Sequence, residues 1–135
     1  MKQMLITVND YRRLIVLMEL ASLKAKMPRS AKQLNDALMN AKMLPPENIS
    51  SSVITMNSRV LVRDLSSGRE TELTIAYPKD ADNPEGKVSV FSEIGIALLG
   101  QQAGNKVSWK VPTGNGQFEI LKVTYQPEAV GKYYS

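Results

Sequence analysis

The sequence has 135 residues, a net charge of +4, and neither cysteine nor histidine. The length accommodates one compact core but is short for two full domains, so we expect one main domain with an appendage. The missing residue types exclude disulfides, thiolate chemistry, the usual zinc sites and the commonest general base.

The first predicted element is a helix that starts near Asn9, which is a plausible N-cap. The apolar residues after it follow the three-and-four spacing of a helix stripe: Tyr11, Leu14, Ile15, Met18, Ala21 or Ser22, and Ala25. Pro28 disfavours a helical conformation at Met27 and lacks an amide donor. We therefore predict that the first helix ends near Met27.

A second helix is predicted from Ser30, or the residue before it, to the segment Leu44-Pro45-Pro46. Its apolar stripe consists of Leu34, Ala37, Leu38 and Ala41. Because the turn between the two helices is short, they must be antiparallel neighbours. Each has about 15 residues, which at roughly 1.5 Å per residue gives a hairpin only about 22 Å long. Residues 1–46 are thus predicted to form a short helical hairpin, or coiled coil.

Positive charge is concentrated in this first third. Residues 1–46 carry eight basic and three acidic side chains, whereas residues 47–135 carry nine basic and ten acidic ones. An electropositive hairpin is suited to an acidic protein surface or a phosphate backbone. A solvated helix face is the alternative interpretation.

Residues 47–135 predict a strand-rich domain with one helix. The expected strands are 53–63, 70–77, 88–91, 107–111 and 118–125, and the expected helix is 94–101. Residues 64–69 suit a hairpin turn, and 78–86 are polar and contain proline, which favours an exposed loop. Trp109 and Phe118 lie on adjoining strands, where core packing is the default. A twisted antiparallel sheet packed on one helix is the simplest α+β arrangement of these elements.

The stretch Val88-Ser89-Val90-Phe91-Ser92-Glu93-Ile94-Gly95-Ile96-Ala97-Leu98-Leu99-Gly100-Gln101-Gln102-Ala103-Gly104 changes from a two-residue period to a short apolar helix between glycines. It resembles the carboxyl domain of the bacterial Gre transcript-cleavage factors. The segments Val123-Thr124-Tyr125-Gln126-Pro127-Glu128-Ala129 and Val53-Ile54-Thr55-Met56-Asn57-Ser58-Arg59-Val60 narrow the resemblance to a small relative within that family. The resemblance implies an FKBP-like fold for residues 47–135 and RNA polymerase as the partner.

The resemblance also implies that the carboxyl domain docks on the rim of the polymerase secondary channel. The contacts carried over to this chain are Val90, Phe91, Ser92 and Ile94. Glu93 departs from the family, in which proline is typical at this position, and the contact there is expected to differ. The alternative interpretation is a strand-to-helix connection with Ser92 as N-cap and Glu93 in the first turn, where the helix dipole favours a carboxylate. Four further residues are expected to determine the fold instead: Leu98, Leu99, Gly100 and Gly104.

The turn of the hairpin, residues 23–32, contains four cations and no acid: Lys24, Lys26, Arg29 and Lys32. In Gre factors, acidic residues at the corresponding tip help to hold a catalytic magnesium, which requires oxygen ligands. Four cations would repel a metal, so we expect no metal, no cofactor, no catalytic residue and no stimulation of RNA cleavage. The cations are predicted to touch an acidic polymerase surface. Contact with nucleic-acid phosphates and simple solvation are the alternatives.

Two functions therefore remain open. The first is a non-enzymatic transcription regulator that binds RNA polymerase at the secondary channel and competes with Gre-type factors. The alternative is a protein-interaction module that affects nucleoside diphosphate kinase levels through another partner, an effect that the resemblance to the small relative implies. No signal-peptide pattern and no apolar run of the roughly 20 residues that span a bilayer are found, so we expect a cytoplasmic protein without membrane contact. A monomer is expected separately, and the oligomeric state stays open.

Overall fold

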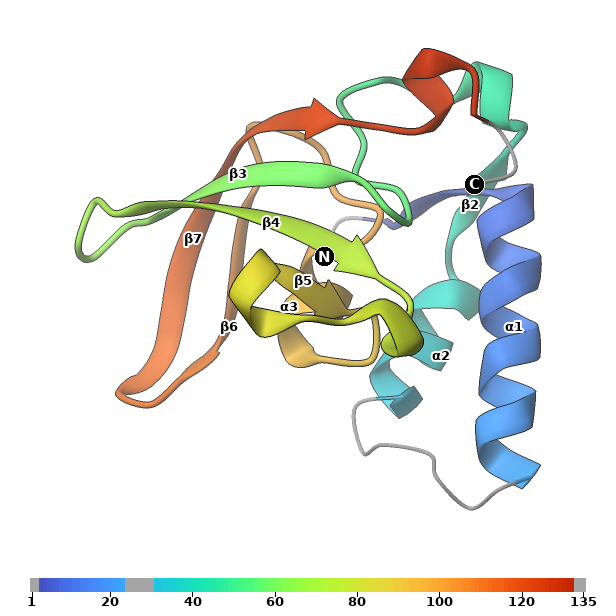
Figure 1. Cartoon of the computed structure of the whole chain (residues 1–135), viewed down its shortest axis with the longest axis horizontal. Helices are drawn as coiled ribbons and strands as arrows, with labels where there is room; N and C mark the ends of the chain where they lie inside the picture. The colour runs from blue at the N-terminus through green and yellow to red at the C-terminus, as the bar shows by residue number, and fades with distance from the viewer. Residues whose placement is uncertain (1–2, 24–30, 133–135) are drawn as a thin grey trace.

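The computed structural model describes residues 3–23 and 31–132, and a five-stranded sheet that curls around one short helix dominates it (Figure 1). The strands of this sheet are β3 (Arg59–Asp64), β4 (Glu70–Ala76), β5 (Lys87–Ser89), β6 (Lys106–Val111) and β7 (Gly114–Tyr125). The short helix is α3 (Glu93–Leu98). The predicted α+β class is confirmed.

The sheet order is β5-β4-β3-β7-β6. Three neighbouring pairs are antiparallel: β3 with β4, β3 with β7, and β6 with β7. Register shifts occur in the β3–β7 pair between Arg59 and Val60 and between Leu61 and Val62. Such bulges increase the local twist of the strands and help the sheet to curl. The prediction of a wholly antiparallel sheet was wrong for β5, which pairs parallel to β4. The crossover 77–86 returns the chain to the same end of the sheet and contains the short turns η2 (Pro78–Asp80) and η3 (Asn83–Glu85).

Helix α1 (Val8–Leu23) begins slightly earlier than predicted. Asn9 lies inside it, and the amide of Asp10 donates to Thr7 Oγ1 at 3.1 Å. Thr7 is therefore the N-terminal capping side chain in place of Asn9. The expected break near Met27 lies outside the described residues.

Helix α2 (Ala31–Met39) has nine residues, so the prediction of about 15 was too long. The chain leaves the helix because β2 (Lys42–Leu44) pairs parallel with β1 (Leu5–Thr7) in a separate two-stranded sheet. The amide of Lys42 donates to the carbonyl of Met4 at 2.9 Å. These backbone bonds replace those that a longer helix would have made.

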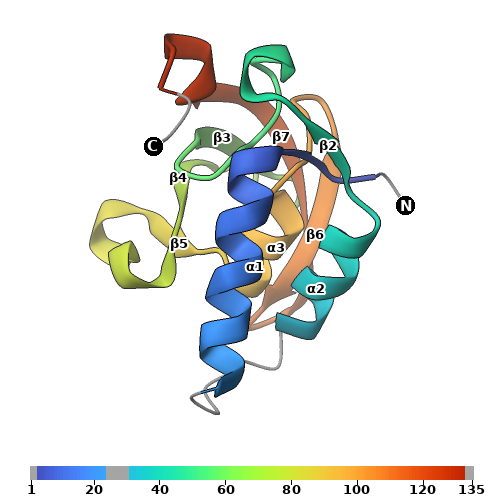
Figure 2. The ribbon, with the colours of Figure 1, turned by 90° about the vertical axis from the view of Figure 1, so that its right-hand side faces the viewer.

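Both helices pack against the sheet domain (Figure 2). Leu14 and Met18 of α1 and Leu34 and Leu38 of α2 are buried in one hydrophobic cluster with residues of the sheet and of α3. The predicted apolar stripes therefore face the core. Beyond them, the rings of Trp109 and Phe118 stack with centroids 3.7 Å apart, which confirms their expected role in packing.

Candidate polymerase-binding loop and neighbouring groove

The connection from β5 to α3 is held by hydrogen bonds from two serines. Ser89 Oγ accepts from the amide of Phe91 at 3.1 Å, and the Ser92 hydroxyl donates to the carbonyl of Ser89 at 2.6 Å. The amide of Gly95 in turn donates to Ser92 Oγ at 3.0 Å. The predicted N-cap at Ser92 is confirmed, and the loop has a defined conformation.

The five residues predicted to contact a partner differ in exposure. Glu93 is exposed in the first turn of α3, whereas Phe91, Ser92 and Ile94 are partly exposed. Val90 is fully buried, and its amide donates to the carbonyl of Ala76 at 2.8 Å. The prediction that Val90 contacts a partner was therefore wrong. Its side chain packs in the core beneath the loop and has no exposed surface.

Gly95 allows the start of α3 to pack closely against the backbone at the end of β5. A Cβ atom at this position would overlap the carbonyl oxygen of Ser89 and lie 2.9 Å from the Cα atom of Val90. Leu98 and Leu99 are fully buried, and Gly100 and Gly104 have positive φ angles of 79° and 96°. Burial of the two leucines and the positive φ angles of the two glycines agree with the fold-determining role predicted for these four residues.

Ile94 also lines a small pocket of about 210 Å³ on the concave face of the sheet. Its other walls include Leu73, Val62 and the stacked pair Trp109 and Phe118. The sequence placed the two aromatic residues in the core but gave no sign of a pocket beside them. An apolar recess therefore adjoins the candidate loop.

Of the four predicted tip cations, Lys32 is described, and it is exposed in the first turn of α2. Lys24, Lys26 and Arg29 lie outside the described residues. Within residues 3–23 and 31–132, no three His, Cys, Asp or Glu side chains are grouped as a metal site would require.

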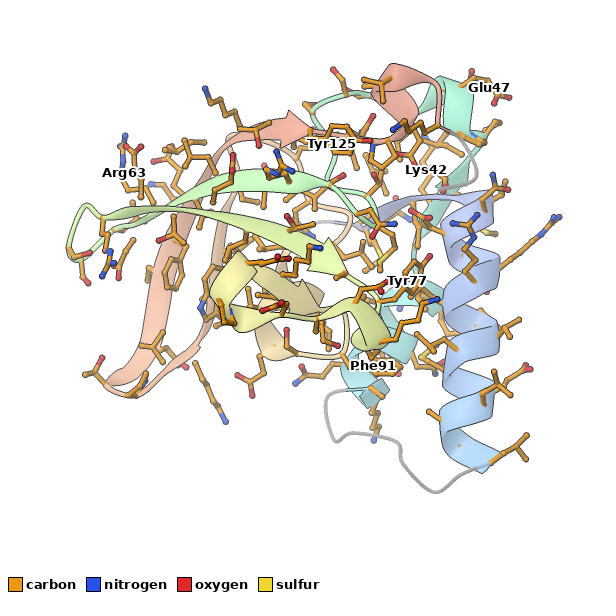
Figure 3. All side chains as sticks on the ribbon, viewed as in Figure 1. Lys42, Glu47, Arg63, Tyr77, Phe91 and Tyr125 are labelled. Atoms are coloured by element: carbon orange, nitrogen blue, oxygen red, sulfur yellow. The ribbon has the colours of Figure 1, made fainter. Side chains whose placement is uncertain are left out.

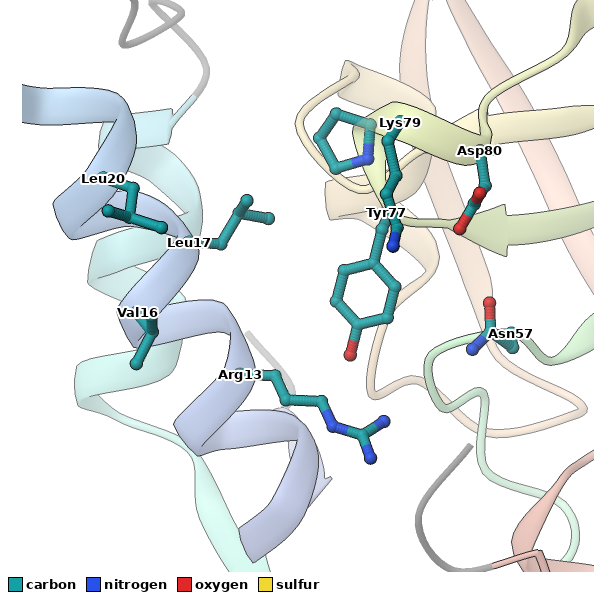
Figure 4. Close-up of a pocket in the computed structure, with 9 residues that line it drawn as sticks. Arg13, Val16, Leu17, Leu20, Asn57, Tyr77, Lys79 and Asp80 are labelled. Atoms are coloured by element: carbon teal, nitrogen blue, oxygen red, sulfur yellow. The ribbon is translucent and has the colours of Figure 1, made fainter. Parts of the chain in front are cut away.

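A larger groove, of about 690 Å³, lies between α1 and η2 (Figure 4). We call it the α1–η2 groove. Its lining is contributed by α1, by the loop before β3 and by the chain after β4: Arg13, Val16, Leu17, Leu20, Asn57, Tyr77, Pro78, Lys79 and Asp80. Sequence reasoning missed it, although Val16 and Leu20 are apolar residues that lie off the predicted stripe of α1 and could have indicated it.

Two buried carboxylates, one in the first turn of α1 and one in the turn after β7, were also missed by sequence reasoning. Asp10 is 2% exposed and Glu128, in the turn η4 (Glu128–Val130), is 8% exposed. Burial raises the pKa of Asp10 to about 7. The hydrogen bond from the Met56 amide and the positive charge of Arg13 lower this pKa, and the nearby charge of Glu128 raises it. Burial, followed by the charge of Asp10, also raises the pKa of Tyr77.

Comparison with known proteins identifies the family. Residues 49–125 match the family described as transcription elongation factor GreA/GreB, C-terminal domain. The chain belongs to the GreA/GreB family. It is 40% identical over 104 residues, 76% of each chain, to the protein of Escherichia coli strain K12 named regulator of nucleoside diphosphate kinase. It is 31% identical over 99 residues, 73% of this chain and 63% of the relative, to the transcription elongation factor GreA of Amoebophilus asiaticus.

Solved structures of the family have the same architecture. A GreA/GreB elongation factor from Nitrosomonas europaea aligns with a TM-score of 0.79 and 36% identity, over 93% of this chain and 100% of that one. GreA factor homolog 1 of Thermus thermophilus aligns with a TM-score of 0.50 and 26% identity, over 92% and 100%. These matches confirm the predicted resemblance to the Gre factors and to their small relative. No helix among the described residues is long and apolar enough to cross a membrane.

Proposed function

We propose that this GreA/GreB family member is a non-enzymatic regulator that binds RNA polymerase at the rim of the secondary channel, in the cytoplasm, as a monomer. The contact residues are Phe91, Ser92, Glu93 and Ile94. The observation that carries the proposal is the serine-capped loop, which holds these side chains in one conformation at the surface of the domain that matches the family. A loop fixed before binding loses little conformational entropy on docking.

We also propose a division of roles between residues 1–46 and residues 47–135. The carboxyl part docks on the polymerase, and the helical hairpin points its basic turn at the channel. The cations Lys24, Lys26, Arg29 and Lys32 contact an acidic polymerase surface, with nucleic-acid phosphates as the weaker alternative.

Competition with Gre-type factors without RNA cleavage is the second part of the proposal. The sequence between Glu19 and Asp36 contains no carboxylate that could ligate magnesium at the turn. Helix α1 has 16 residues, which corresponds to roughly 24 Å, so the hairpin is short as well as basic. Such a hairpin occupies the channel entrance without contributing to the chemistry.

The loop is tested by measuring affinity for core RNA polymerase by biolayer interferometry. We expect Glu93→Lys and Ile94→Ala each to weaken binding by about tenfold, a typical loss for an interface contact of this kind. The matched control is Glu47→Lys, which makes the same charge change at an exposed position that lies apart from Phe91 in Figure 3. Equal affinity for Glu93→Lys, Ile94→Ala and the control would reject the loop as the contact.

The alternative is a protein-interaction module that affects nucleoside diphosphate kinase levels through another partner. The name of the Escherichia coli relative favours it. Measuring kinase levels in cells that express the wild type or Glu93→Lys separates the two functions. If the variant has lost polymerase binding and still changes kinase levels as the wild type does, the second partner exists.

A further inference from the structure

The α1–η2 groove has apolar walls that are exposed among residues 3–23 and 31–132, which the structure describes. Val16 and Leu20, on the outer side of α1, are 54% and 50% exposed. The opposite wall is formed by Tyr77 and Pro78, and Figure 4 shows Leu17 pointing across the groove toward the Tyr77 ring. Apolar side chains exposed together in a concavity of this size are typical of a binding site.

The groove lies next to the candidate polymerase-binding loop in the sheet. The amide of Val90 donates to the carbonyl of Ala76 at 2.8 Å, so these two residues are adjacent at the ends of β5 and β4. Tyr77 follows Ala76 into the groove wall, and Phe91 follows Val90 into the loop. A partner that docks on Phe91 and its neighbours is therefore within reach of the groove.

Charge at the groove narrows the chemistry of the occupant. Arg13 extends from the α1 wall, Lys79 lies on the η2 wall, and Asp80 is the carboxylate among the lining residues. The lining thus carries two cations and one carboxylate, Arg13 also interacts with Tyr77 and Asp10, and α1 is part of the electropositive segment 1–46. Charge complementarity favours an occupant whose apolar side chains are flanked by an acidic residue.

We propose that the α1–η2 groove is a second docking surface for RNA polymerase, which inserts apolar side chains of a helical segment flanked by a carboxylate. A groove with apolar side chains of a helix on one wall and an aromatic ring on the other suits the helix-in-groove mode of recognition. This inference rests on the proposed function and deepens it: the polymerase contacts residues 47–135 through the loop and also contacts helix α1 through the groove. Simultaneous contact fixes the hairpin's direction relative to the polymerase.

The test uses the full chain and core RNA polymerase. Leu20 is replaced by a photo-crosslinking amino acid, and separately Leu20→Gln and Lys79→Glu are assayed for affinity. We expect a Leu20 adduct with a polymerase subunit and about tenfold weaker binding by each variant. The matched controls are Leu65→Gln, at the exposed β3–β4 turn, and Lys110→Glu, on β6, which should bind as the wild type does.

The outcomes separate this inference from the proposed function. If the wild type binds polymerase and Glu93→Lys weakens it, while Leu20→Gln and Lys79→Glu bind normally and no polymerase adduct forms, the groove proposal alone is overturned. An adduct between two copies of the chain overturns it too, since the occupant is then a second copy. Failure of the wild type to bind polymerase at all contradicts the proposed function and removes the groove proposal with it.

Discussion

The carboxylate of Asp10 accepts a hydrogen bond from the backbone amide of Met56, with Oδ2 3.1 Å from the nitrogen. The preceding residue, Thr55, donates its hydroxyl to Glu128 Oε1 at 2.7 Å. Two buried carboxylates, one from α1 and one from η4, thus hold consecutive residues of the loop that leads into β3. The attachment of the helical hairpin to the sheet domain depends on this polar junction as well as on apolar packing.

The junction makes stability depend on pH through Asp10. Its pKa is raised from 3.8 to about 7 in the folded protein, so the folded state holds a proton that the unfolded state has lost. The stabilisation by this proton is complete below about pH 3.8 and is lost as pH rises through about 7. Three pKa units at about 1.4 kcal/mol each set an upper limit of roughly 4 kcal/mol.

Asp10→Asn tests this linkage, because the amide stays neutral and can still accept from Met56. We expect the free energy of unfolding of the variant, relative to wild type, to increase by roughly 2 to 3 kcal/mol between pH 5 and pH 8 in urea titrations, because about two of the three pKa units fall within this window. Asp36→Asn, exposed on α2, serves as the control and should run parallel to wild type. Parallel curves for Asp10→Asn would show that Asp10 is ionised throughout.

Ser92→Ala tests the capped loop. The substitution removes the acceptor for the Gly95 amide and the donor to the Ser89 carbonyl, and we expect it to cost about 1 kcal/mol of unfolding free energy. Ser92→Thr keeps both groups and should recover most of the loss. Polymerase affinity should follow the same order, because the cap positions Phe91 and Glu93. An alanine variant as stable as the threonine variant would contradict the capping role.

Gly95→Ala should destabilise the protein by more than 2 kcal/mol, since the added Cβ overlaps the Ser89 carbonyl, which is backbone and cannot move aside cheaply. Gly104→Ala provides the comparison. Its Cβ would meet nothing within 4 Å, so only the strain of its positive φ remains, about 1 kcal/mol. Equal losses in thermal and urea unfolding would show that α3 can shift away from β5.

Neutralising the four tip cations together, as Lys24→Gln, Lys26→Gln, Arg29→Gln and Lys32→Gln, should lower polymerase affinity at low salt and flatten its salt dependence. Surface charges are screened at high salt, so the variant and the wild type should converge there. A control variant instead removes four cations from residues 47–135: Lys106, Lys110, Lys122 and Lys132. Equal binding of tip variant and wild type across the titration would exclude the tip from the interface.

Local sequence patterns predicted most elements because their signals are local. The stripe through Leu14 and Met18 and the cap at Ser92 each depend on residues within a few positions. The β1–β2 pair could not be predicted in this way, since three-residue strands that join Leu5 to Lys42 have no periodicity to detect. That pair also explains the overestimated length of α2.

The candidate site was predicted only in part, because burial and pocket formation depend on contacts between distant segments. Family resemblance located the loop but not the burial of Val90, whose side chain lies in the hydrophobic cluster while its amide donates to the carbonyl of Ala76. Charged residues are exposed by default, so nothing in the sequence indicated that Asp10 and Glu128 are buried. The α1–η2 groove forms between segments about 60 positions apart, and only the packing of α1 reveals it.

Competition at core RNA polymerase tests the central claim most directly. The full chain is bound to immobilised core enzyme, excess GreA is added, and transcript cleavage is measured on stalled complexes with each factor. The account predicts that GreA displaces the chain and that the chain suppresses GreA-stimulated cleavage while stimulating none itself. Simultaneous binding of both factors, or RNA cleavage stimulated by this chain alone, would contradict it.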